Sequence, residues 1–161
     1  MWRMNPEKIK ARRSDATYGI ATTLPFDQMR HNPHHMFYNP EQREYRCRSV
    51  FNVFLEKGEI ASADQVITTC MTPASQSFTQ ISITIHSTPY LGIQYTADMH
   101  GRSTVYKIGQ LVINIPNPRN LPLHQRIVDI TMDFSGTEIQ AKAKYHITGE
   151  EVKTVCDFLS A

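Results

Sequence analysis

The chain has 161 residues and a formal net charge of +2 at pH 7. It is long enough for one domain with a buried core, and its charge gives no sign of the basic surface that nucleic-acid binding requires. No apolar run approaches the ~20 residues that cross a bilayer, and the N-terminus lacks the apolar core of a secretory signal. The cysteines, Cys47, Cys70 and Cys156, are odd in number and far apart, which is typical of a reducing compartment. We expect a cytoplasmic protein that binds neither nucleic acid nor membrane.

The N-terminal part of the chain, up to about Val50, is rich in proline and polar residues. We expect a short strand at residues 17–22 and then an irregular insertion at about residues 25–46, because proline neither donates to a ladder nor continues a helix. The insertion also carries large apolar side chains, each worth about 1.5–3 kcal/mol when buried. We therefore expect it to fold back over an open edge or a groove mouth, with a mobile surface loop as the alternative. These side chains are Phe26, Met29, Met36, Phe37 and Tyr38.

After Val50 the sequence alternates between apolar and polar residues, the pattern of half-buried strands. The clearest case places Phe78, Ile81, Ile83 and Ile85 on one sheet face, with a bulge near residue 79. Turn residues separate the stretches. The expected strands are residues 49–56, 76–87, 91–98, 105–115, 125–134, 138–147 and 151–159. The last has helical spacing at some positions, but its β-branched content favours a strand.

Many short strands at regular spacing, with no convincing amphipathic helix, predict an all-β antiparallel sandwich. Three prolines, Pro116, Pro118 and Pro122, separate two of these strands. Since proline removes a backbone donor and restricts φ, this segment cannot join either ladder. We expect a stiff crossing from one sheet to the other.

The order of features in residues 9–159 resembles the substrate-binding β-domain of the heat shock 70 kDa chaperone family. There a strand is followed by a Pro-Arg-Gly-x-Pro crossing, a strand of the Ile-x-Val-Thr-Phe-Asp kind and an Asn/Asp-Gly turn. Here the corresponding residues are 108–111, 116–122, 130–133 and 135–136. The segments "ISITIHS" and "KGEIA" also look like family strands and turns.

The segment "IKARRSDATYGIATT" is similar to the family's interdomain linker and first strand, and "RRSxxTYGI" resembles the divergent type-twelve, lidless branch. Residues 1–16 would then be a linker remnant, and residues 17–161 the β-sandwich domain. The linker is charged here and apolar in the ordinary family, which puts its docking to an ATPase domain in doubt. No ATPase domain precedes it in this sequence, so we expect a fragment or a shortened gene product.

The resemblance implies a stress-response chaperone domain that binds extended apolar peptide segments weakly and has no ATPase activity of its own. It implies no cofactor in this chain, with ATP used only if a nucleotide-binding domain is supplied elsewhere, and an ATPase domain or co-chaperone as a further partner. Four apolar residues of the implied peptide-binding site are also candidates for simple core packing: Ile20, Ile83, Ile85 and Val128. Thr23 replaces an apolar arch residue, so the grip on peptide should be weaker than usual. The implied peptide-binding residues are Ile20, Thr22, Thr23, Cys70, Pro73, Ile83, Ile85 and Val128.

Other chemistry finds little support in the sequence. No nucleophile elbow, phosphate loop or marked carboxylate pair is present, so we expect no enzyme activity. His31, His34 and His35 lie in a Pro/Asn-rich loop without Cys or acidic residues at ligand spacing, which favours a solvated loop over a metal site. The alternative function is a non-catalytic β-sandwich that docks to other proteins without capturing peptides. A metal or nucleic-acid module is a third, less favoured class.

Overall fold

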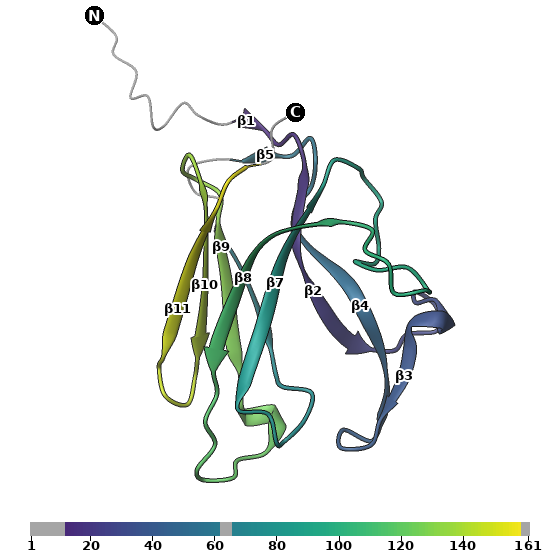
Figure 1. Cartoon of the computed structure of the whole chain (residues 1–161), viewed down its shortest axis with the longest axis vertical. Helices are drawn as coiled ribbons and strands as arrows, with labels where there is room; N and C mark the ends of the chain where they lie inside the picture. The colour runs from purple at the N-terminus through teal and green to yellow at the C-terminus, as the bar shows by residue number, and fades with distance from the viewer. Residues whose placement is uncertain (1–11, 62–65, 159–161) are drawn as a thin grey trace, which may run out of the picture.

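The structure is a computed structural model that describes residues 12–61 and 66–158. The described part of the chain is an all-β fold of two antiparallel sheets, which confirms the predicted class (Figure 1). The five-stranded sheet has the order β3-β4-β2-β7-β8, with β3 at Met36–Asn39, β4 at Glu44–Leu55, β2 at Thr17–Pro25, β7 at Gln80–Thr88 and β8 at Tyr106–Asn114. The four-stranded sheet has the order β11-β10-β9-β6, with β11 at Glu151–Cys156, β10 at Ile139–Tyr145, β9 at Val128–Asp133 and β6 at Val66–Met71.

The remaining elements are short. Strands β1 (Arg12–Arg13) and β5 (Ile60–Ala61) form a separate two-stranded pair, and two single 3-10 turns occur at η1 (Pro33–His35) and η2 (Leu123–Gln125). In the part of the chain that the structure describes, no helix is long and apolar enough to cross a membrane. Residues 1–11, which hold most of the expected linker remnant, lie outside the described residues.

The core is built from the inward-facing positions of both sheets, at the period of two that the sequence shows. In β9 and β10 every second position is buried along the whole strand, and the positions between are half-buried or exposed. The same alternation in β7 buries Ile81, Ile83 and Ile85, which join one apolar cluster with residues of β2, β8, β9 and β10. Burying these side chains is the main favourable term for this fold, since each is worth about 1.5–3 kcal/mol.

Most of the expected strands are confirmed, and the C-terminal segment is a strand up to Cys156. The proline crossing also has the expected role, because it leads from β8 in one sheet to β9 in the other. Residues 91–98 are a correction: they form a loop held by single bridges at Tyr95 and Ala97. Phe78 was expected on the same buried strand face as Ile81, and this is also corrected: β7 begins at Gln80, and the Phe78 side chain is 47% exposed. The sequence did not predict β3 or β6, which are short and lack a clear alternation of apolar residues.

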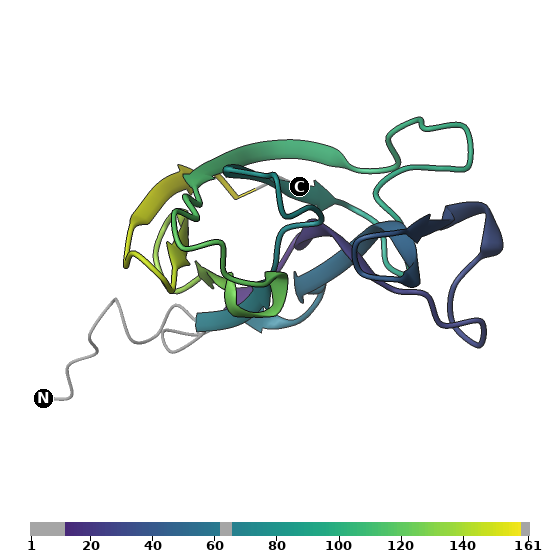
Figure 2. The ribbon, with the colours of Figure 1, turned by 90° about the horizontal axis from the view of Figure 1, so that it is seen from below.

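The insertion at residues 25–46 is ordered by contacts with two other segments. Its strand β3 pairs with the first residues of β4, and the loop at residues 89–105 packs beside it (Figure 2). The Asn32 amide donates to the Tyr95 hydroxyl over 2.7 Å, and the Gln94 side chain donates to the Arg30 carbonyl, also over 2.7 Å. Five apolar side chains were expected to drive this packing, but Phe26 and Phe37 alone are half-buried. Met29, Met36 and Tyr38 are exposed.

Candidate functional site

The candidate site begins where strands β2 and β7 separate. They pair from Thr17 to Ile20, opposite Ile85 to Thr88, and no further. Beyond that point residues 21–25 of β2 pair with β4 alone, and residues 80–84 of β7 pair with β8 alone. Figure 1 shows the two strands diverging, with β4 and β3 following β2 away from the four-stranded sheet.

A bulge in β4 lies next to this divergence. Thr22 pairs with Val50, but Leu24 pairs with Cys47, so β4 holds one residue more than β2 over this stretch. The extra length is accommodated at Ser49, whose φ of 59° lies in the left-handed region that non-glycine residues rarely adopt. A bulge of this kind bends the strand and increases its twist. The outer halves of β2 and β4 beyond this bulge lie away from β7 (Figure 1).

The space between the diverging strands is a cavity of about 620 Å³, which we call the β2–β7 groove. Its volume lies in the range of ligand-binding pockets. Its walls come from the free half of β2, from β4, from the end of β6 with the loop after it, and from the start of β7. The lining residues are 21–25, Arg46, Arg48, Ser49, Asn52, 69–74, Phe78, and 80–82.

Three unpaired strand edges meet at this groove. Two are the free halves of β2 and β7, and the third belongs to β6, which is the edge strand of its sheet and pairs with β9 alone. An unpaired edge presents backbone N–H and C=O groups that can pair with another extended chain. Apolar side chains stand at both walls, with Leu24 38% exposed on β2 and Phe78 47% exposed before β7. The groove can therefore offer both backbone hydrogen bonds and apolar contacts.

The wall formed by residues 72–79 is held in place by a buried arginine. Arg126 has no exposed surface, and its guanidinium donates to the carbonyls of Gln76, Phe78 and Ile115 over 2.6–3.0 Å. Its Nε also donates to the Tyr145 hydroxyl over 3.3 Å. Because these bonds join the loop to the ends of β8 and β10, the wall is fixed to the core of the sandwich.

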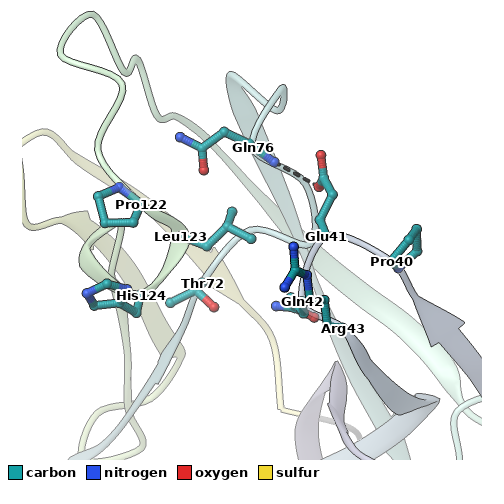
Figure 3. A pocket seen from close by; sticks show the side chains of 9 residues that line it. All are labelled: Pro40, Glu41, Gln42, Arg43, Thr72, Gln76, Pro122, Leu123 and His124. Atoms are coloured by element: carbon teal, nitrogen blue, oxygen red, sulfur yellow. Dashed lines mark hydrogen bonds between the residues drawn. The ribbon is translucent and has the colours of Figure 1, made fainter.

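The tip of the insertion contacts the other side of the same loop. The Asn39 side-chain amide donates to the Ala74 carbonyl over 3.0 Å, and the Gln76 backbone N–H donates to the Glu41 carboxylate over 3.0 Å. Figure 3 shows the second of these bonds beside a neighbouring cavity of about 660 Å³. That cavity is lined mainly by polar side chains and prolines of the insertion tip and of η2. The insertion thus packs against the loop that forms the groove wall.

The eight residues that the sequence suggested for peptide binding fall into two groups. Thr22, Thr23, Cys70 and Pro73 all line the β2–β7 groove, although they come from segments some fifty residues apart. The apolar four do not line it and are buried in the core, with exposures of 0–1%. These four are Ile20, Ile83, Ile85 and Val128. Their side chains support the strands around the groove and have no surface to offer to a ligand in this conformation.

Several groove residues were not singled out from the sequence. Arg46 lies within the stretch expected to be an irregular insertion, Leu24 and Arg48 lie between that stretch and the expected strands, and Phe78 was assigned to a strand. The alternation of Tyr45 and Cys47 with the polar residues around them was a short signal that β4 starts before Ser49. A strand spanning that position would have placed the two arginines beside the end of β2.

The histidines of the insertion point to separate partners. The Asp27 amide donates to His31 Nδ1 over 2.9 Å, whereas the His35 ring is buried and stacks on Tyr95 with 3.8 Å between ring centres. Burial lowers the pKa of His35, and the positive charges of Arg48 and His34 lower it further. Among the described residues, no three His, Cys, Asp or Glu side chains are grouped as a metal site.

The three cysteines differ in access to solvent. Cys47 and Cys156 are buried, and burial raises the pKa of both thiols. Cys70 is exposed and lines the groove. The thiolate is the reactive form, and burial both shields the other two thiols and raises their pKa. Cys70 is therefore the thiol that reagents should reach in the folded protein.

Comparison with known proteins adds a relationship. No family model matches the chain. It is 27% identical over 158 residues to "Heat shock 70 kDa protein 12A" of Homo sapiens, and equally to the protein of that name in Mus musculus. The alignments cover 98% of this chain and 22% of each relative, so the chain spans about a fifth of the length of the curated relatives it matches. This similarity supports a relationship between the chain and the heat shock 70 kDa family.

Proposed function

We propose that this chain is a chaperone-type substrate-binding β-sandwich that holds extended, apolar peptide segments in the β2–β7 groove. The observation that carries the proposal is the meeting of three unpaired strand edges at one cavity with apolar side chains on both walls. A peptide entering the groove would pair with a free edge and place alternate side chains against residues such as Leu24 and Phe78. The relationship to the heat shock 70 kDa family agrees with this proposal. Any ATP-dependent steps of the binding cycle would belong to an ATPase domain outside this chain.

The expected affinity is low. Thr23, Leu24 and Phe78 are exposed, so the groove is open to solvent and a bound peptide is not enclosed. A short peptide also loses conformational freedom when it is ordered along a strand edge. We expect a Kd in the micromolar range or weaker, with fast dissociation.

Protection of Cys70 from alkylation tests both binding and its location. A leucine-rich heptapeptide should slow the reaction of Cys70 with a thiol reagent in a saturable manner, and a fluorescent version should show a matching rise in anisotropy. A serine/glycine heptapeptide of equal length and charge is the control and should do neither. Anisotropy that does not change up to millimolar protein would refute peptide binding, and binding without protection of Cys70 would place the peptide elsewhere.

A second candidate is a docking domain that captures no peptide, with an ATPase domain or a co-chaperone as its partner. It is favoured by the pair Tyr38 and Tyr45, which are 51% and 56% exposed and meet edge to face at the outer edge of the five-stranded sheet. Tyrosines with this exposure are enriched in protein interfaces. Replacing both by Ser would abolish partner capture under this candidate and leave peptide affinity unchanged under the first.

A further inference from the structure

The charged side chains that line the β2–β7 groove are all positive. Arg46 and Arg48 of β4 line it, and none of the lining residues is Asp or Glu. The two arginines do not have the same freedom, and the difference between them indicates which ligand charge the groove can accept.

Arg46 is already engaged by its own chain. Its Nη1 forms a 2.6 Å ion pair with Glu44, and its Nη2 donates to the Thr23 carbonyl over 3.0 Å. Its side chain is 14% exposed. Arg46 therefore ties the free half of β2 to β4, and its charge is largely balanced by Glu44.

Arg48 has no such partner. It is exposed, and its guanidinium carbon lies 4.7 Å from the centre of the Phe37 ring. No carboxylate in the described part of the chain lies within ion-pairing distance of it. A guanidinium stacked on an aromatic ring keeps its N–H groups free at the edge of the plane, where they fit the two oxygens of a carboxylate.

From this geometry we infer that the groove selects apolar peptide segments that carry a carboxylate beside the apolar residues, and that Arg48 binds this carboxylate. The inference rests on the proposed peptide binding and adds the charge class of the ligand. An Asp or Glu side chain and a free peptide C-terminus offer the same group. A flanking Lys or Arg should be disfavoured, because it would face an unpaired positive charge.

The test compares heptapeptides that share a leucine-rich centre and differ in their flanks. Three peptides have an amidated C-terminus and carry two Asp, two Asn or two Lys residues as flanks. The fourth carries the two Asn residues and a free C-terminus. Binding is measured by anisotropy at 50 mM and 300 mM NaCl. We expect the Asp peptide to bind about threefold to tenfold more tightly than the Asn peptide, as for a partly solvated charge pair, and the gain to shrink at high salt. A comparison of the two Asn peptides, amidated and free, shows whether a C-terminal carboxylate can replace an Asp side chain.

Three variants assign the effect to Arg48. Arg48→Gln should remove the preference for Asp, so that the Asp and Asn peptides bind with equal affinity, and its binding of the Asn peptide shows that the groove is folded. Arg48→Lys should keep part of the preference, since it retains the charge without the planar guanidinium. Arg119→Gln is the control, because it removes one exposed positive charge outside the groove and should keep the full preference.

The outcomes separate this inference from the proposed function. Equal binding of the Asp, Asn and Lys peptides would overturn the carboxylate preference and leave peptide binding in place. A preference that survives in Arg48→Gln would overturn the role of Arg48. Failure of every peptide to bind would overturn both.

Discussion

The buried guanidinium of Arg126 donates a 2.6 Å hydrogen bond to the carbonyl oxygen of Phe78, across 48 residues of sequence. Phe78 lines the β2–β7 groove, whereas Arg126 lies wholly inside the protein. Its charge is met by backbone carbonyls and the Tyr145 hydroxyl, and no carboxylate of residues 12–61 or 66–158 is among its partners. The position of the groove wall thus depends on a residue that cannot touch the ligand.

Arg126→Met should destabilise the fold by about 3–5 kcal/mol, because it leaves buried carbonyls without donors. The free energy of unfolding is measured in urea, with far-UV circular dichroism as the signal. Tyr145→Phe is the milder companion, since it removes only the hydroxyl that accepts from Arg126 and donates to the Pro116 carbonyl, and should cost about 1–2 kcal/mol. Equal stability of wild type and Arg126→Met would contradict the bracing role of Arg126.

Gly19→Ala should destabilise the protein by about 2 kcal/mol or more. A Cβ at Gly19 would lie far inside van der Waals contact with the backbone carbonyl oxygen of Asn52, and a backbone atom cannot move aside without distorting the strand. Gly136→Ala is the matched control, because its nearest neighbour would lie at an ordinary 3.7 Å, and the change should stay within about 0.5 kcal/mol. Similar unfolding midpoints for the two variants would show that β2 and β4 are not packed as described.

Acidification should destabilise the fold as the pH falls through about 6.5, the ordinary pKa of histidine. Burial lowers the pKa of both His35 and His86 in the folded state, with Arg48 and His34 adding to the effect at His35 and Lys107 at His86. Nearby Asp98 opposes it at His35, and a backbone hydrogen bond at Tyr106 opposes it at His86. The unfolded chain then binds more protons than the folded one, so stability is full above the unfolded pKa and declines below it.

Melting temperatures between pH 7.5 and 5 check this expectation. The double variant His35→Gln and His86→Gln should show a shallower decline than wild type, although its stability at pH 7.5 will be lower through lost packing. The exposed His124→Gln variant is a control that keeps both His35 and His86 and the groups that shift their pKa. A decline that is equally steep in the double variant would mean that other groups carry the proton linkage.

The contacts of the insertion tip should restrain the groove wall. Replacing Asn39 and Glu41 together by Ala removes the bonds to Ala74 and Gln76, so trypsin should cut faster after Arg43 and the peptide should dissociate faster. Cleavage after Arg30 serves as the internal reference, because that residue is held by Gln94 on the other side of the insertion. Unchanged cleavage and unchanged dissociation in the variant would leave the insertion as a surface loop without influence on the groove.

The residue pattern alone determined the fold class and most of the strands. In β7, β9 and β10 an apolar residue at every second position allows one arrangement of the strand against a core, so local sequence was sufficient. The prolines at positions 116, 118 and 122 likewise excluded the crossing from either ladder whatever the surrounding structure.

The tertiary structure alone decided which residues form the groove. A period of two predicts that Ile83 and Ile85 share one face of their strand, but it does not say whether that face meets the other sheet or a ligand, and here it meets the other sheet. The groove exists because β2 and β7 stop pairing beyond Ile20, beside bulges in β4, and no local pattern records where two strands stop pairing. Arg126 shows the same limit from the opposite side. Its charge predicts a surface position, and only three carbonyls contributed by two distant segments make its burial favourable.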